Sequence, residues 1–96
     1  MTEIIEDAVE ALREKMSKNS FDGTAKFEIE GEGSIVISEN KVYTSDEETD
    51  VTFKASVEIF QDIFIGDLNP TSAFMTGKLK IDGDMGTAMR LANVFG

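Results

Sequence analysis

The chain of 96 residues contains no histidine, no cysteine and no tryptophan. Histidine is the commonest general base near neutral pH, and cysteine thiolates are frequent nucleophiles. Both side chains are also the main protein ligands of transition metals. The sequence has no G-x-S-x-G or S-x-x-K motif that would provide a serine nucleophile instead. We therefore expect no catalytic activity, no cofactor and no metal site.

The same composition bears on where the chain works. Without cysteine there is no disulfide framework and no sign of secretion. No segment approaches the roughly 20 consecutive apolar residues that span a bilayer. The first residues, "MTEIIEDAVEALREKM", are acidic and polar on one face, unlike a signal peptide. These features predict a cytoplasmic protein.

Positive charge is also scarce, with 9 Lys and Arg against 19 Asp and Glu, for a formal net charge of −10. Such a chain repels nucleic acid, and no basic stripe with aromatic residues overcomes that repulsion. An anionic membrane surface would also repel it, so we expect no nucleic-acid partner and at most transient membrane contact. The acidic run over residues 45–50 reads as a solvated loop, because it lacks the spaced ligands and glycine turn of a calcium site.

The hydrophobic pattern alternates between helical and strand periods. The length predicts a single domain over residues 1–96. Helical spacing predicts four helices, over residues 3–16, 57–66, 70–76 and 85–95. Their predicted N-caps are Thr2, Ser56, Asn69 and Asp84. Alternating apolar residues predict five strands, beginning near Lys26 and continuing over residues 34–38, 41–44, 51–55 and 79–81.

This order of elements, with runs of strands and helices kept apart, is typical of the α+β class. The positions that would point outward from the strands are polar: Lys26, Glu28, Glu30, Thr52, Lys54, Lys78, Lys80 and Asp82. We therefore expect a sheet with one face covered by helices and the other facing solvent.

One segment remains unexplained by these rules. Residues 69–95 bring together five phenylalanine and methionine side chains, Phe74, Met75, Met85, Met89 and Phe95. Three glycines in the same segment suit the end of a helix and a corner between a strand and a helix. A phosphate site at "DGDMG" is disfavoured, because the two flanking carboxylates would repel the anion.

The stretch "GDLNPTSAFMTGKLKIDGDMGTAMRLAN", residues 66–93, strongly resembles the C-terminal third of the sterol carrier protein type-2 family of lipid-binding domains. The residues that carry the resemblance are Gly66, Asn69, Pro70, Ser72, Ala73, Phe74, Gly77 to Ile81, Gly83, Met85, Gly86, Ala88, Met89 and Leu91. The preceding "DVTFKASVEIFQDIFIG" and "AKFEIEGEGSIVISENKVYT" are similar to the family in pattern.

The resemblance implies an α+β fold with a five-stranded, mostly antiparallel sheet, one face of which is covered by helices. It also implies an apolar tunnel between sheet and helices that carries a fatty acid, a fatty acyl-CoA, or a sterol-like or isoprenoid-like lipid. Flexible methionine side chains suit such a site, because they repack around ligands of different shape. The isolated domain would have no enzymatic chemistry.

We therefore predict a lipid carrier, with the ligand mouth near residues 65–69 or near the C-terminus. The predicted wall consists of Phe60, Ile63, Phe64, Phe74, Met75, Met85, Met89 and Phe95. The alternative is a protein–protein interaction or dimerisation module, such as a homodimer, that keeps the fold without a usable cavity. In that case Ile65, Val94 and Phe95 would form a partner patch.

Overall fold

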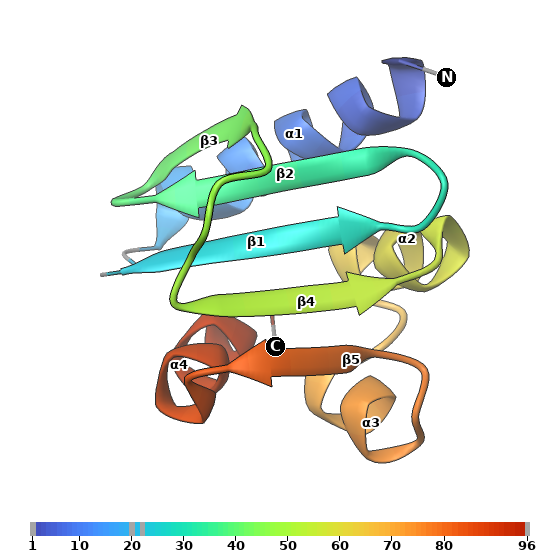
Figure 1. Cartoon of the computed structure of the whole chain (residues 1–96). Coiled ribbons are helices and arrows are strands. Elements are labelled where there is room, and N and C mark those ends of the chain that lie inside the picture. The colour runs from blue at the N-terminus through green and yellow to red at the C-terminus, as the bar shows by residue number, and fades with distance from the viewer. Residues whose placement is uncertain (1, 20, 22, 96) are drawn as a thin grey trace.

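The computed structural model describes residues 2–19, 21 and 23–95, and the side chains of residues 5–19, 21 and 23–94. The sheet has five strands in the order β3-β2-β1-β4-β5, and Figure 1 shows how the helices lie around it. The elements are α1 (Thr2–Lys18), β1 (Thr24–Ile29), β2 (Gly33–Ser38), β3 (Lys41–Thr44), β4 (Val51–Ala55), α2 (Val57–Ile65), α3 (Pro70–Met75), β5 (Lys80–Gly83) and α4 (Met85–Phe95).

The two central strands β1 and β4 run parallel, and the other neighbouring pairs are antiparallel. The predicted α+β class with a five-stranded, mostly antiparallel sheet is therefore confirmed. The parallel pair arises because the chain crosses from β3 to β4 over the sheet instead of turning back in a hairpin (Figure 1). Parallel neighbours need such a crossover.

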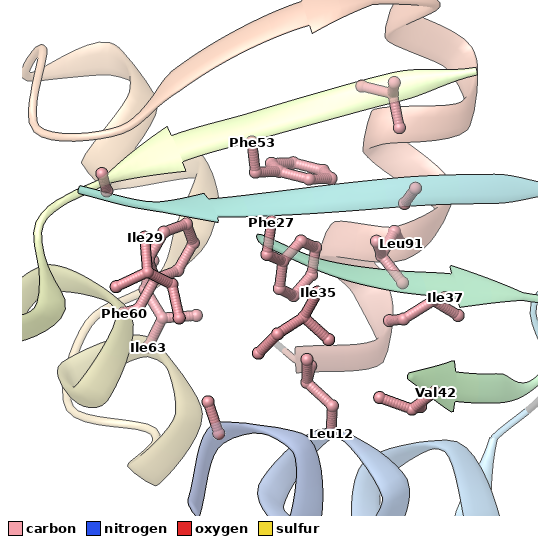
Figure 2. Packing of buried hydrophobic residues seen from close by; sticks show 14 of the residues in the cluster. Leu12, Phe27, Ile29, Ile35, Ile37, Val42, Phe53, Phe60, Ile63 and Leu91 are labelled. Atoms are coloured by element: carbon pink, nitrogen blue, oxygen red, sulfur yellow. The ribbon is translucent and has the colours of Figure 1, made fainter. Parts of the chain in front are cut away.

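The core lies between one face of the sheet and the helices. Leu12 of α1, Ile35 and Ile37 of β2, and Leu91 of α4 have no exposed surface. Figure 2 shows these side chains converging from helices and strands on one side of the sheet. The alternation of apolar residues along β1, β2 and β4 produces this face, because successive strand side chains point to opposite sides.

The helix signals read from the sequence operate as expected in α2 and α3. Ser56 accepts a hydrogen bond from the Ile59 backbone N–H at 3.3 Å, and Gly66 ends α2 in the left-handed conformation, with φ at 88°. Asn69 accepts hydrogen bonds from the Thr71 and Ser72 backbone N–H groups, and Pro70 occupies the first turn of α3. These caps define the segment that connects the two helices.

Several predicted boundaries differ from the structure by one or two residues, and two of these differences have a structural consequence. Helix α1 extends from Thr2 to Lys18, so Thr2 lies inside the helix instead of capping it. Strand β5 begins at Lys80, although Leu79 is buried as predicted. The backbone N–H groups of Lys78 and Leu79 donate to the Ala73 carbonyl oxygen over 2.8 and 3.1 Å. These two donors complete the end of α3, so they are unavailable to the sheet.

The predicted solvent-facing side of the sheet is partly covered. The connection between β3 and β4 crosses this face (Figure 1), and the Lys26 ammonium lies 3.3 Å from the Asp46 carboxylate. Val36, which is opposite Lys26 and Tyr43 in register, is fully buried. The segment that contains the acidic run thus crosses part of this face, while its acidic side chains stay exposed as expected of a solvated loop.

Candidate functional site

Three stacked phenylalanine rings lie where α2 packs on the sheet. Phe60 and Phe64 are one helical turn apart, with ring centres at 5.8 Å. Phe27 of β1 stacks on both, with centres at 5.6 and 6.0 Å. Phe53 of β4 meets Phe27 edge-on, with centres at 5.2 Å and an angle of 86° between the rings. This aromatic cluster is the apolar centre from which the neighbouring cavities open.

The first cavity lies between α1 and α2 and has a volume of about 150 Å³. Its lining residues are Asp7, Ala8, Ala11, Ile29, Val57, Phe60, Gln61, Phe64 and Ile65. Most of these side chains are apolar, and the small alanines of α1 leave space opposite the large side chains of α2. This cavity has the composition of a small-ligand site, which is mainly apolar with few polar groups.

A second space lies deeper, between α2, α3, α4 and the sheet. It measures only about 10 Å³, and a void of that size holds at most about one water molecule. It is lined by Phe27, Phe53, Phe60, Ile63, Phe64, Pro70, Leu79 and Ala92. The interior beneath the aromatic cluster is therefore closely packed.

A third space of about 270 Å³ lies between the second half of α1 and α4. It is lined by Ala11, Glu14, Lys15, Lys18, Asn19, Phe64 and Val94. Lys18 and Glu14 form an exposed ion pair at 3.7 Å, and Lys15 adds a further positive charge. One side of this crevice is therefore apolar and the other is locally basic, in an otherwise acidic chain.

A crevice of about 350 Å³ between α1 and β3 has a different character. Its lining includes the charged or polar side chains of Glu6, Glu10, Arg13 and Tyr43. Arg13 donates a hydrogen bond to the Val42 carbonyl oxygen over 3.1 Å, which ties α1 to the edge strand. This arrangement serves the fold, and none of the stacked phenylalanines lines the crevice.

The structure divides the eight predicted wall residues into two groups. Phe60 and Ile63 are buried and Phe64 is half-buried, and all three line the cavities around the aromatic cluster. The other group is exposed to solvent. The exposed fractions of its side chains are 37% for Phe74, 79% for Met75, 41% for Met85 and 37% for Met89. These four border none of the cavities described above. The side chain of Phe95 lies outside the described residues.

The α1 side of the first cavity was missed by sequence reasoning. Ala8 and Ala11 line it, and neither is among the predicted wall residues. A signal was present, because small residues on a helix that packs against phenylalanines leave a gap that larger residues would fill. Weighing only large side chains as wall residues obscured that signal.

Ionisable groups add little chemistry to this region. The Thr87 hydroxyl and backbone N–H both donate to the Asp84 carboxylate, and these hydrogen bonds hold the pKa of Asp84 below its ordinary value. The same contacts cap α4, which is a structural role.

Within the described part of the chain, no group of three or more acidic side chains is placed to hold a metal ion. No described helix is both long and apolar enough to cross a bilayer.

Comparison with known proteins identifies the family to which this chain belongs. The model of the SCP-2 sterol transfer family matches residues 4–96. The chain belongs to this family.

Human sterol carrier protein 2 is 41% identical to this chain over 64 residues, which cover 67% of this chain and 11% of the human protein. Peroxisomal multifunctional enzyme A of Dictyostelium discoideum is 46% identical over 61 residues, which cover 64% of this chain and 13% of that enzyme. The chain thus spans about a tenth of the length of these relatives.

Solved structures of the family share the fold. Sterol carrier protein 2 like 2 from Aedes aegypti superimposes with a TM-score of 0.82 at 21% identity, covering 97% of both chains. Sterol carrier protein 2 from the same mosquito, solved in complex with palmitate, gives 0.76 at 18% identity, covering 93% of this chain and 91% of that one. Sterol carrier protein domain 2 of Helicoverpa armigera superimposes with a TM-score of 0.66 at 36% identity. The match covers 95% of this chain and 76% of that one.

Proposed function

We propose that residues 1–96 form one lipid-binding domain, which holds the chain of a fatty acid, a fatty acyl-CoA or a related lipid beside the aromatic cluster. The observation that carries this proposal is the apolar cavity between α1 and α2, which is walled by Phe60 and Phe64. Membership of the SCP-2 sterol transfer family supports it. So does the palmitate bound by a mosquito protein of the same fold.

Burial of the chain would provide the affinity. Each methylene removed from water contributes about 0.8 kcal/mol. The aromatic wall adds contacts with the buried Phe60 ring, which its stacking on Phe27 already holds in place. No strong polar anchor is then needed for a chain of moderate length. We therefore infer a carrier that performs no chemistry on its ligand, and a cytoplasmic location stays a prediction.

The size of the cavity sets a condition on this function. A dry apolar cavity of about 150 Å³ accommodates a molecule such as benzene. The first cavity has this volume, so a long lipid needs more room than this conformation provides. Flat, rigid sterols would demand a larger rearrangement than a flexible acyl chain. This difference favours acyl chains over sterols as ligands.

The exposed group of Phe74, Met75, Met85 and Met89 stays a predicted part of the wall. Helices α3 and α4 pack against each other, and each carries two of these four side chains. Unbranched methionines next to a site could fold over a ligand that extends toward them. We expect them to contact the part of a ligand that extends beyond the aromatic cluster.

Displacement of a fluorescent fatty acid by a series of saturated acids tests the function. Affinity should rise with chain length, by about fourfold per methylene while each new methylene is buried. Native mass spectrometry of freshly purified protein should show added mass of lipid size. A flat response to chain length, together with failure to load any lipid, would contradict the proposal.

A second candidate function rests on a different observation. The large exposed apolar side chains, Ile65, Phe74, Met75, Met85 and Met89, all belong to residues 65–89. Residues 65–96 contain three acidic and three basic side chains, so the whole net charge of −10 resides in residues 1–64. A segment with no net charge and several exposed apolar groups is typical of an interaction surface. Sedimentation over a range of concentrations would reveal a homodimer, and Met75→Asp should weaken it.

A further inference from the structure

We propose that Phe64 sets the length of the lipid chain that this domain can bury. The inference rests on the proposed lipid-binding function and adds a specificity-determining residue to it. Phe64 lies in the last turns of α2, at the point where that helix faces both α1 and the aromatic cluster.

The position of Phe64 relative to the cavities is the first observation. Among the described residues, it borders all three spaces around the aromatic cluster: the cavity between α1 and α2, the closely packed inner void, and the crevice between α1 and α4. Phe60 borders the first two, and Ala11 borders the first and third. The Phe64 ring is therefore the shared partition.

The burial of the three stacked rings is the second observation. Phe27 is 2% exposed and Phe60 is 3% exposed, so both are enclosed by the core. Phe64 is only half-buried, and it packs at the edge of that core. A half-buried ring at the edge of a cluster loses fewer contacts when it rotates than an enclosed ring does. Phe64 is thus the ring of the three whose rotation should disturb the core least.

These two observations determine how chain length is limited. A lipid chain that enters between α1 and α2 fills about 150 Å³ and then meets the Phe64 ring. Further methylenes stay in water unless the ring moves aside. Rotation of the ring would join the first cavity to the crevice of about 270 Å³ behind it. The joined space falls within the roughly 300–1,000 Å³ of sites that enclose drug-sized ligands.

The test measures affinity for saturated n-alkanoic acids of about six to eighteen carbons, using the whole chain and its variants. In the wild-type protein, affinity should rise by about fourfold per methylene and then reach a plateau. Phe64→Ala removes the partition, so its plateau should lie at least two carbons higher. Phe64→Trp enlarges the partition, so its plateau should lie lower.

Ile59→Ala is the matched control. Ile59 is on the same helix and is also partly buried, but it borders none of these three spaces. Its plateau should equal that of the wild type even if its stability falls. Phe64→Leu, a milder truncation, should shift the plateau in the same direction as Phe64→Ala and serves if the alanine variant fails to fold.

The outcomes separate this inference from the function on which it rests. If the wild type binds acids with length-dependent affinity but the Phe64 variants share its plateau, the role of Phe64 is refuted and lipid binding stands. If Ile59→Ala shifts the plateau as much as Phe64→Ala, the effect is general loosening of α2, which also refutes it. If no acid binds the wild type, both proposals fail.

Discussion

The backbone N–H of Asp84 donates to the carbonyl oxygen of Asp50 over 2.9 Å. This hydrogen bond joins the corner between β5 and α4 to the residue just before β4. Gly83, next to Asp84, pairs in register with Val51 and has φ at 112°. A Cβ at Gly83 would collide with the carbonyl oxygen of Asp50 and approach the Val51 Cα to 2.9 Å. The corner therefore requires glycine for two independent reasons, backbone conformation and space.

Gly83→Ala should destabilise the protein strongly. Left-handed backbone alone costs a residue with a side chain about 1–2 kcal/mol, and the collision with backbone atoms adds to that cost. Gly31→Ala is the matched control, because Gly31 has φ at 82° but nothing lies within 4 Å of the added Cβ. Chemical denaturation of both variants checks the difference. Equal losses of stability would show that the corner can open to accept a Cβ.

Asp84→Asn should change the pH dependence of stability. The hydrogen bonds from Thr87 hold the pKa of Asp84 below its ordinary value in the folded state. The carboxylate therefore stabilises the fold above its ordinary pKa, and that contribution is lost as the pH falls through the lowered value. Asparagine caps helices about as well as aspartate but does not titrate. Thermal melts between about pH 2 and pH 6 should show a shallower acid decline for the variant.

Leu12→Ala should cost about 2–5 kcal/mol, the usual range for truncating an enclosed leucine. Leu12 has no exposed surface and belongs to the cluster drawn in Figure 2. Met75→Ala should change stability by less than about 0.5 kcal/mol, because this side chain is 79% exposed. Denaturation curves for the two variants test whether the core was assigned correctly, and similar losses would contradict it.

Lys15→Gln combined with Lys18→Gln should change the binding of an alkanoic acid and of an alkanol of the same length equally. Both lysines line the crevice between α1 and α4, whereas the proposed lipid chain enters between α1 and α2 and leaves its headgroup at that entrance. Exposed charges act modestly and are screened by salt, so they have little effect on a distant headgroup. Lys41→Gln, at an exposed position of β3, is the control. A loss of affinity confined to the acid would place the headgroup at the crevice and contradict the direction of entry.

Met89→Trp tests whether the exposed group forms part of the lipid wall. Met89 is 37% exposed, so the larger ring can extend into solvent and the fold should tolerate it. If the predicted wall is right, lipid affinity should fall and the new indole fluorescence should respond to ligand. The chain has no tryptophan of its own, so the signal has no background. Unchanged affinity and fluorescence would remove Met89 from the wall.

Local chemistry allowed much of the fold to be predicted from the sequence. The period of apolar residues along the chain identified every helix and strand, because each element buries one face. Ser56, Asn69 and Asp84 marked helix starts, since their side chains accept hydrogen bonds from otherwise unpaired N–H groups. The start of β5 was predicted wrongly because two structures compete for the same backbone group. Leu79 has a strand-like pattern, but its backbone N–H donates to the Ala73 carbonyl oxygen at the end of α3.

Only the tertiary structure decided which apolar residues enclose space and which face solvent. Phe60 and Met75 look equally suitable as wall residues in the sequence, yet one is 3% exposed and the other 79%. The difference depends on how helices pack over the sheet, and that packing is set by contacts between segments far apart in the chain. The first cavity exists because alanines of α1 meet phenylalanines of α2, a pairing that no local pattern encodes.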